Sequence, residues 1–160
     1  MARKTLANPV DNREILSRMG NVRPGSARRW GKMTPHEMIC HLSDSLRMVM
    51  GEKPCSPAPR NQRPAPFLPR SFVKWFALEI PLPWPKGVPT RPEVDPLDGG
   101  TRPSAFDIDL RQLLALHDRF TRRPMDFKYA AHPIFGVMTE SEWMRWAYLH
   151  ADHHLRQFAL

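Results

Sequence analysis

Apolar residues recur at helical spacing in several stretches of the chain. In each stretch they stand three or four positions apart, as they do on one face of an α-helix. No stretch shows sustained alternation of apolar and polar residues, although 127–138 has room for a few extended residues between turns. The sequence therefore predicts an all-α fold. The four main predicted helices are 11–19, 33–51, 104–120 and 139–158, and a shorter one covers 69–80.

Two of these helices begin with a capping box. Thr34 precedes Pro35 and is followed three positions later by Glu37, and Thr139 and Glu142 repeat the arrangement. In such a box the threonine and the glutamate each satisfy a backbone N–H that the helix leaves unpaired. The sequence therefore predicts that both helices start at these threonines.

The other two main helices have other terminal signals. We expect Asp11 to cap the first one and Gly20 to end it. For 104–120 we expect Ser104 as the cap and Asp107 as its partner. These assignments complete four amphipathic helices of unequal length.

Proline is concentrated in the middle of the chain. Thirteen of the 18 prolines fall between Pro54 and Pro103, and proline both breaks helices and removes a backbone donor. We therefore expect a four-helix bundle in which a long proline-rich crossover, about 52–103, connects the second and third helices and carries the short extra helix. We expect 1–160 to be one domain with this insertion.

The composition is that of a globular protein: 41% of the 160 residues are hydrophobic and 25% are charged. The most apolar stretch, 72–85, is interrupted by charges and prolines, so we expect no membrane span. No apolar leader follows the first basic residues, so we expect a cytoplasmic protein. Cys40 and Cys55 form no recognisable framework, and we expect both to be reduced thiols.

The formal net charge of +8 raises the question of nucleic acid. The basic residues are scattered singly and in pairs, as at Arg28 and Arg29, and make no run of five or more. No nucleic-acid-binding motif accompanies them. We therefore favour a basic surface without a specific partner, or one that attracts anionic small molecules, over one that binds nucleic acid.

Histidines are concentrated near the end of the chain, where three of the seven fall within five residues. His150 and His154 are four positions apart and lie on one helix face, and His153 is an alternative to His154. His41 lies on or beside the apolar stripe of 33–51. If the two helices face each other, three neutral imidazoles meet, which suits a divalent first-row metal. The spacing leaves open a hydrogen-bonded core histidine and a surface cluster.

Two motifs favour the metal hypothesis. The segments "WGKMTPHEMICHLSDSLRMVMG" and "HPIFGVMTESEWMRWAYLHADHHLRQF" resemble the DinB-like superfamily, in particular a branch of small proteins with a His-His-Leu-Arg-Gln-Phe type ending. The similarity covers about 20–51 and 104–158, and the proline-rich middle aligns with nothing. The matching positions are His41, Leu42 and Asp44 in the second helix, and His150, His154 and Gln157 in the last.

The resemblance implies a four-helix bundle, a three-histidine metal site and a homodimer. It also implies members that act as thiol-dependent transferases or isomerases, or as metal-dependent hydrolases. We expect zinc or nickel as the ion, with iron and manganese as alternatives.

Several neighbouring residues have weaker assignments. Asp44 is one turn after His41 and would orient that ring, unless it lies on a solvated face. Gln157 would hold water or a ring nitrogen. We expect Cys40 to be a packing residue, and His132 to shape the turn before the last helix, with lining of the site as the alternative.

Three functions are compatible with these features. The first is a metal-dependent enzyme of the DinB-like kind, which activates water as a hydrolase or a thiol as a transferase on a small, anionic substrate. The second is a metal-containing dimeric binding or stress-response module without turnover. The third is a basic protein associated with nucleic acid.

Overall fold

The computed structural model describes residues 3–63 and 65–160, and its fold is all-α, as predicted. Within these ranges the only extended pairing is an isolated bridge between His132 and Gly136. The α-helices are α1 (Pro9–Gly20), α2 (Pro35–Val49), α3 (Arg70–Glu79), α4 (Phe106–Thr121) and α5 (Glu140–Arg156), and two 3-10 turns are η1 (Arg60–Gln62) and η2 (Pro92–Val94).

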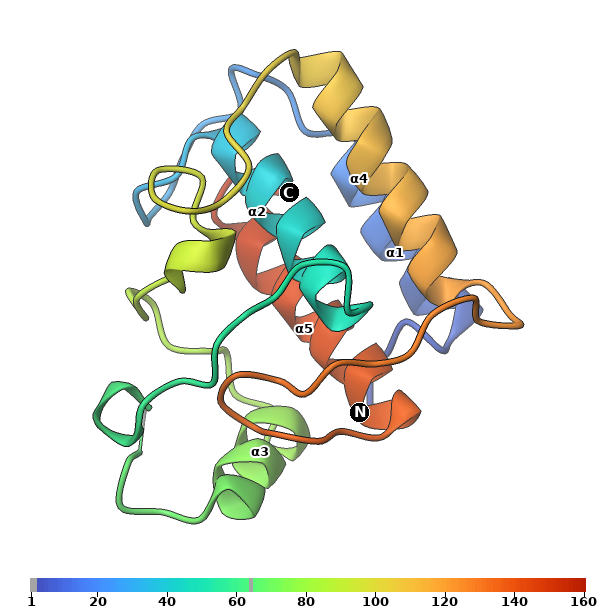
Figure 1. Ribbon diagram of the computed structural model, residues 1–160. Helices are drawn as coiled ribbons and strands as arrows, with labels where there is room; N and C mark the ends of the chain where they lie inside the picture. Colours follow the sequence, from blue (N-terminus) through green and yellow to red (C-terminus); the bar gives the residue numbers. More distant parts are fainter. Residues whose placement is uncertain (1–2, 64) are drawn as a thin grey trace.

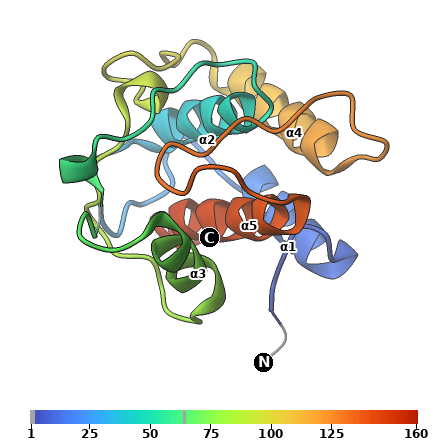
Figure 2. The same ribbon diagram turned by 60° about the horizontal axis from the view of Figure 1, so that its bottom comes forward.

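The four longer helices form two layers. Figure 2 shows α2 beside α4 in one layer and α5 beside α1 in the other. Contacts of α1 with α4 and of α2 with α5 close the two layers on each other. The short α3 packs on α5, and it has no comparable contact with another helix of the described residues. As a result, α2 and α5 lie side by side although most of the chain separates them (Figure 1).

Both predicted capping boxes are confirmed. The Glu37 backbone N–H donates to Thr34 Oγ1 at 3.2 Å, and the Thr34 N–H donates to Glu37 Oε2 at 2.6 Å. At α5 the matching distances are 3.3 Å and 2.7 Å, between Thr139 and Glu142. These boxes hold the first turns of the two helices that carry the histidines.

The predicted start of α1 was wrong. Its cap is Asn8, whose Oδ1 accepts the Val10 N–H at 2.8 Å, and Pro9 opens the helix. Asp11 instead accepts the Thr5 N–H at 2.9 Å. Proline is favoured at the first helical position because it lacks the N–H that would be unpaired there, and this moves the start two residues upstream.

The predicted partner of Ser104 was also wrong. The helix begins at Phe106, and the Ser104 N–H and hydroxyl both donate to the Asp109 carboxylate, at 2.8 and 3.0 Å. Ser104 is not the cap either, because Ala105 precedes the helix and no side chain caps it. Asp109 instead ties the residue before the cap to the first turn of α4.

The core lies between the two layers. Its largest fully buried side chains come from all four long helices: Ile15, Met19, Met38, Ile39, Leu113, Phe120, Trp143 and Leu155. Both cysteines of the described chain are free thiols, as predicted. None of the described helices combines the length and the apolar character that crossing a membrane requires.

The proline-rich crossover is attached to α2. The Thr101 N–H and hydroxyl donate to Asp44 at 2.6 and 2.8 Å, and the Val94 carbonyl accepts from His41 at 2.8 Å. Because Asp44 is fully buried, these bonds hold the end of the crossover tightly against the middle of α2.

Candidate metal centre

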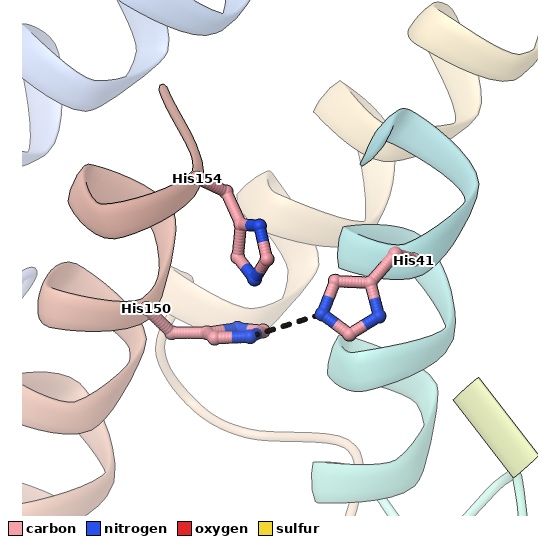
Figure 3. A group of neighbouring side chains, drawn as sticks. All are labelled: His41, His150 and His154. Atoms are coloured by element: carbon pink, nitrogen blue, oxygen red, sulfur yellow. Dashed lines mark hydrogen bonds between the residues drawn. The ribbon is translucent and has the colours of Figure 1, made fainter. Parts of the chain in front are cut away.

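Three imidazole rings converge between α2 and α5. Figure 3 shows His41 from α2 facing His150 and His154 from α5. The ring centroids are 4.6 Å apart for His41 and His154, 4.7 Å for His150 and His154, and 5.1 Å for His41 and His150. One nitrogen from each ring lies within 4.8 Å of the others. The predicted three residues therefore do come together.

The centre is shielded from solvent. His41 and His154 are 5% and 8% exposed, and His150 is half-buried. Burial is the main cause that lowers the pKa of all three imidazoles, and for His150 and His154 the neighbouring histidines lower it further. The rings are therefore neutral at neutral pH, which is the form that binds metal ions.

Hydrogen bonds select which nitrogen faces the centre. His41 Nδ1–H donates to the Val94 carbonyl, so the lone pair of this ring is on Nε2. His154 Nδ1–H donates to Gln157 Oε1 at 2.9 Å, with the same result. Acceptors of this kind commonly fix the tautomer of metal-binding histidines. Gln157 thus lies where the sequence predicted, bound to a ring nitrogen.

The nitrogen spacing suits a shared ion. His41 Nε2 and His150 Nε2 are 3.1 Å apart. Two nitrogens that each bind one ion at about 2.0–2.1 Å are about 2.8–3.4 Å apart, for angles between octahedral and tetrahedral. Without an ion this contact is a hydrogen bond from His150 Nε2–H to His41 Nε2. The two nitrogens already have the spacing that a shared first-row metal requires, and His150 would bind it with its proton on Nδ1.

Two tryptophans border His150. Trp146, one turn earlier on α5, stacks on the His150 ring with centroids 4.6 Å apart and planes inclined by 21°. Trp84, from the crossover, lies on another side with a centroid distance of 6.3 Å. The sequence did not identify Trp84 or the Val94 carbonyl as neighbours of the site. Both come from the crossover, and no local pattern marks them.

The predicted contact of Asp44 with His41 was wrong. Val94 occupies the position of the ring acceptor, and Asp44 receives hydrogen bonds from Lys53 at 2.8 Å and from Thr101. The Lys53 bond and the Thr101 bonds help to lower the pKa of the Asp44 carboxyl, against the opposing effect of burial. Asp44 is therefore a structural anchor for the crossover.

The two other histidines considered near the site lie outside the triad. His153 packs edge-on against Trp30, with ring centroids 4.7 Å apart, so His154 is the one that faces His41. His132 Nδ1 accepts the backbone N–H groups of Ile134 and Phe135, both at 3.1 Å. It shapes the turn before α5, as the sequence predicted, and burial lowers its pKa to about 3.

A second group with metal-binding side chains was not predicted. His36 Nε2 is 2.7 Å from Asp109 Oδ2, and Cys40 Sγ is 3.9 Å from the same oxygen. Burial, followed by the charge of Asp109, raises the pKa of the Cys40 thiol to about 12. Cys40 is therefore a buried neutral thiol, and Asp109 already accepts hydrogen bonds from Ser104. His36 and Cys40 share one face of α2, a spacing the sequence does show.

The C-terminal part of the chain is similar to a known protein family. Residues 95–160 match the family described as a protein of unknown function (DUF1569). This segment contains His150, His154 and Gln157 but not His41. No curated protein and no solved structure matches the chain. The similarity thus links the C-terminal part, including two of the three converging histidines, to a family without an assigned activity.

Proposed function

We propose that the chain is a metal-dependent enzyme that binds one divalent first-row metal ion through His41, His150 and His154. The observation that supports this most strongly is the pair of Nε2 atoms 3.1 Å apart, in rings that are neutral and mostly buried. Zinc and nickel are the expected ions, with iron and manganese as alternatives.

Three neutral ligands leave the ion with its full charge and with open positions. When bound, zinc lowers the pKa of a coordinated water to about 7 and can equally stabilise a thiolate. The protein would supply the fixed rings, the acceptors Val94 and Gln157 that hold them, and an apolar wall at Trp84 and Trp146. This environment supports hydrolysis or thiol transfer, the two activities that the DinB-like resemblance implies.

Membership of the DinB-like superfamily is part of the proposal. The two layers formed by α1, α2, α4 and α5, with a crossover between α2 and α4, have the helix number and connectivity expected of such a bundle. The proposal includes a single domain and a homodimer. Light scattering of the purified protein would test the dimer, which predicts twice the chain mass of 18.5 kDa.

Metal content tests the proposal directly. Protein purified without an affinity tag should contain about one equivalent of metal per chain, and His41→Ala and His150→Ala should each lose most of it, because two imidazoles hold an ion far more weakly than three. His153→Ala is the matched control, since His153 neighbours His154 but faces Trp30. It should retain its metal.

The result that would overturn the metal site is a wild-type protein that neither contains nor takes up these four metals at micromolar concentration. Equal metal content in wild type and His41→Ala would remove His41 from the site. Turnover is tested separately, with activated esters and with thiol–electrophile pairs. An intact metal site with no turnover of either kind would favour the binding module.

A further inference from the structure

A cleft opens beside the candidate metal centre. Its volume is about 460 Å³, within the range of small-molecule sites. It is bounded by the segment before α2, by the crossover and by the end of α5. The lining residues that matter for recognition are Arg29, Trp30, Trp84, Lys86, His153 and Arg156.

The cleft is positively charged. Arg29, Lys86 and Arg156 line it, and among the residues that the structure describes no acidic side chain does. Arg156 Nε pairs with Asp152 at 2.9 Å, and that carboxylate also binds Arg18. Arg156 is therefore partly neutralised by a carboxylate that it shares with Arg18, and Arg29 and Lys86 are the groups to which an anion would mainly bind.

Aromatic rings form the remaining walls. Lys86 Nζ lies 5.2 Å from the centroid of the Trp30 ring, and Trp30 packs on His153. Trp84 is held in place by its indole N–H, which donates to the Ala77 carbonyl at 2.9 Å. Flat rings of this kind bind planar apolar groups by stacking.

Trp84 joins the cleft to the histidine triad. Its ring centroid is 6.3 Å from His153, which lines the cleft, and 6.3 Å from His150, which belongs to the triad. His150 is also the only triad member that is not fully buried, within the described structure. A ligand against Trp84 would therefore reach toward the metal position from its most open side.

We infer that this cleft binds a small organic anion with a flat aromatic part, held by Arg29 and Lys86 at the charged end and by Trp84 and Trp30 at the ring. As the substrate site of the enzyme, it rests on the proposed function. As a binding site, it depends only on its own side chains.

The test measures binding of 2-naphthoate by titration calorimetry. The wild type should bind it with a dissociation constant below about 1 mM, and the uncharged 2-naphthylmethanol about tenfold more weakly, since it lacks the charge. Arg29→Gln and Lys86→Gln should each weaken 2-naphthoate binding about fivefold to tenfold, and Trp84→Leu about tenfold.

Matched controls lie elsewhere on the surface. Arg13→Gln alters an exposed arginine of α1, and Trp75→Leu alters a tryptophan of α3 that is 51% exposed. Both should bind 2-naphthoate like the wild type. Circular dichroism checks that each variant is folded. If Trp84→Leu does not fold, Arg29→Gln and Lys86→Gln still test the proposed site.

The metal-free His41→Ala variant separates this inference from the proposed function. Binding of 2-naphthoate should persist there within about threefold, because the cleft charges remain. If 2-naphthoate binding requires the metal, or is unaffected by Arg29→Gln and Lys86→Gln, the cleft is not the anion-binding site that we infer. Persistent binding in a protein that never takes up metal would leave the cleft valid and refute the metal centre.

Discussion

At the residue scale, the candidate centre depends on the acceptors behind the histidines as much as on the histidines. Val94 and Gln157 each bind the Nδ1–H of one ring and so direct its Nε2 lone pair toward the centre. Gln157 is itself positioned by the chain before α2, because the Arg29 backbone N–H donates to the Gln157 backbone carbonyl at 2.7 Å. Gly31 also lies close to this side chain. A methyl group on Gly31, whose φ is +86°, would lie 2.8 Å from Gln157 Nε2 and would displace the glutamine side chain.

Replacement of Gln157 should weaken metal binding without unfolding the protein. Gln157→Leu removes the acceptor of His154 while keeping a similar volume, and loss of such a partner typically lowers metal affinity about 10-fold to 100-fold. Competition with a chromogenic chelator measures the change.

Asp44→Asn is the contrasting variant. Asp44 binds Thr101 and Lys53 and makes no part of the triad, so metal affinity should stay within about twofold of the wild type. Its loss of charge-assisted hydrogen bonds should instead lower the free energy of unfolding by about 2 kcal/mol. If Asp44→Asn weakened metal binding more than Gln157→Leu, the assigned roles of these two residues would be reversed.

At the element scale, α5 carries two of the three histidines and depends on its cap. Thr139→Ala removes the acceptor of the Glu142 N–H, and the expected loss in free energy of unfolding is about 1 kcal/mol. Urea denaturation measures it. Ser17→Ala, at an exposed position of α1, should change stability by less than about 0.5 kcal/mol. Equal effects of the two changes would argue against the capping box.

The contact between α1 and α4 should be sensitive to pH. His117 of α4 is 1% exposed and lies 2.6 Å from Asn12 Oδ1 of α1, and burial lowers its pKa from 6.5 to about 4. Between pH 6.5 and 4 the unfolded chain therefore takes up a proton at His117 that the folded protein does not. Stability rises with pH wherever the unfolded state binds more protons, so it should fall as the pH drops through this window.

His117→Gln isolates this contribution. The variant keeps a donor for Asn12 but does not titrate, so between pH 6.5 and 4 it should lose less unfolding free energy than the wild type, by on the order of 3 kcal/mol. Urea midpoints at several pH values give both slopes. Parallel slopes for the two proteins would mean that His117 takes up its proton at the same pH in the folded and the unfolded state.

At the scale of the whole molecule, the proposed ion would connect the two layers. It would bind α2 of one layer and α5 of the other, two helices that the chain order separates by the entire crossover and α4. Because an ion that binds only the folded state stabilises it, zinc at about 100 times its dissociation constant should contribute about 2.7 kcal/mol.

Zinc binding should raise the Tm by about 5–10 °C for a chain of this size. Scanning calorimetry with and without zinc, after removal of metal by a chelator, measures it. His41→Ala should show almost no rise, and His153→Ala should respond like the wild type. An equal rise in His41→Ala would place the ion elsewhere, for instance at His36, Cys40 and Asp109.

The sequence by itself determined the features whose causes lie within a few residues. Helical spacing predicted all five α-helices, the threonine capping boxes predicted two of their starts, and the i, i+4 spacing placed His150 and His154 on one face. Where two local signals competed, as with Asn8 and Asp11 or Asp107 and Asp109, the sequence-based choice was wrong.

Only the tertiary structure decided what surrounds the histidines. His41 and His150 are 109 residues apart in sequence and Val94 is 53 from His41, and such distant contacts depend on how the layers pack. For the same reason no local pattern showed that Asp44 would hold Thr101, or that Trp84 would lie between a charged cleft and the triad. The proline-rich crossover has no regular period, so its path follows from the side chains it packs against.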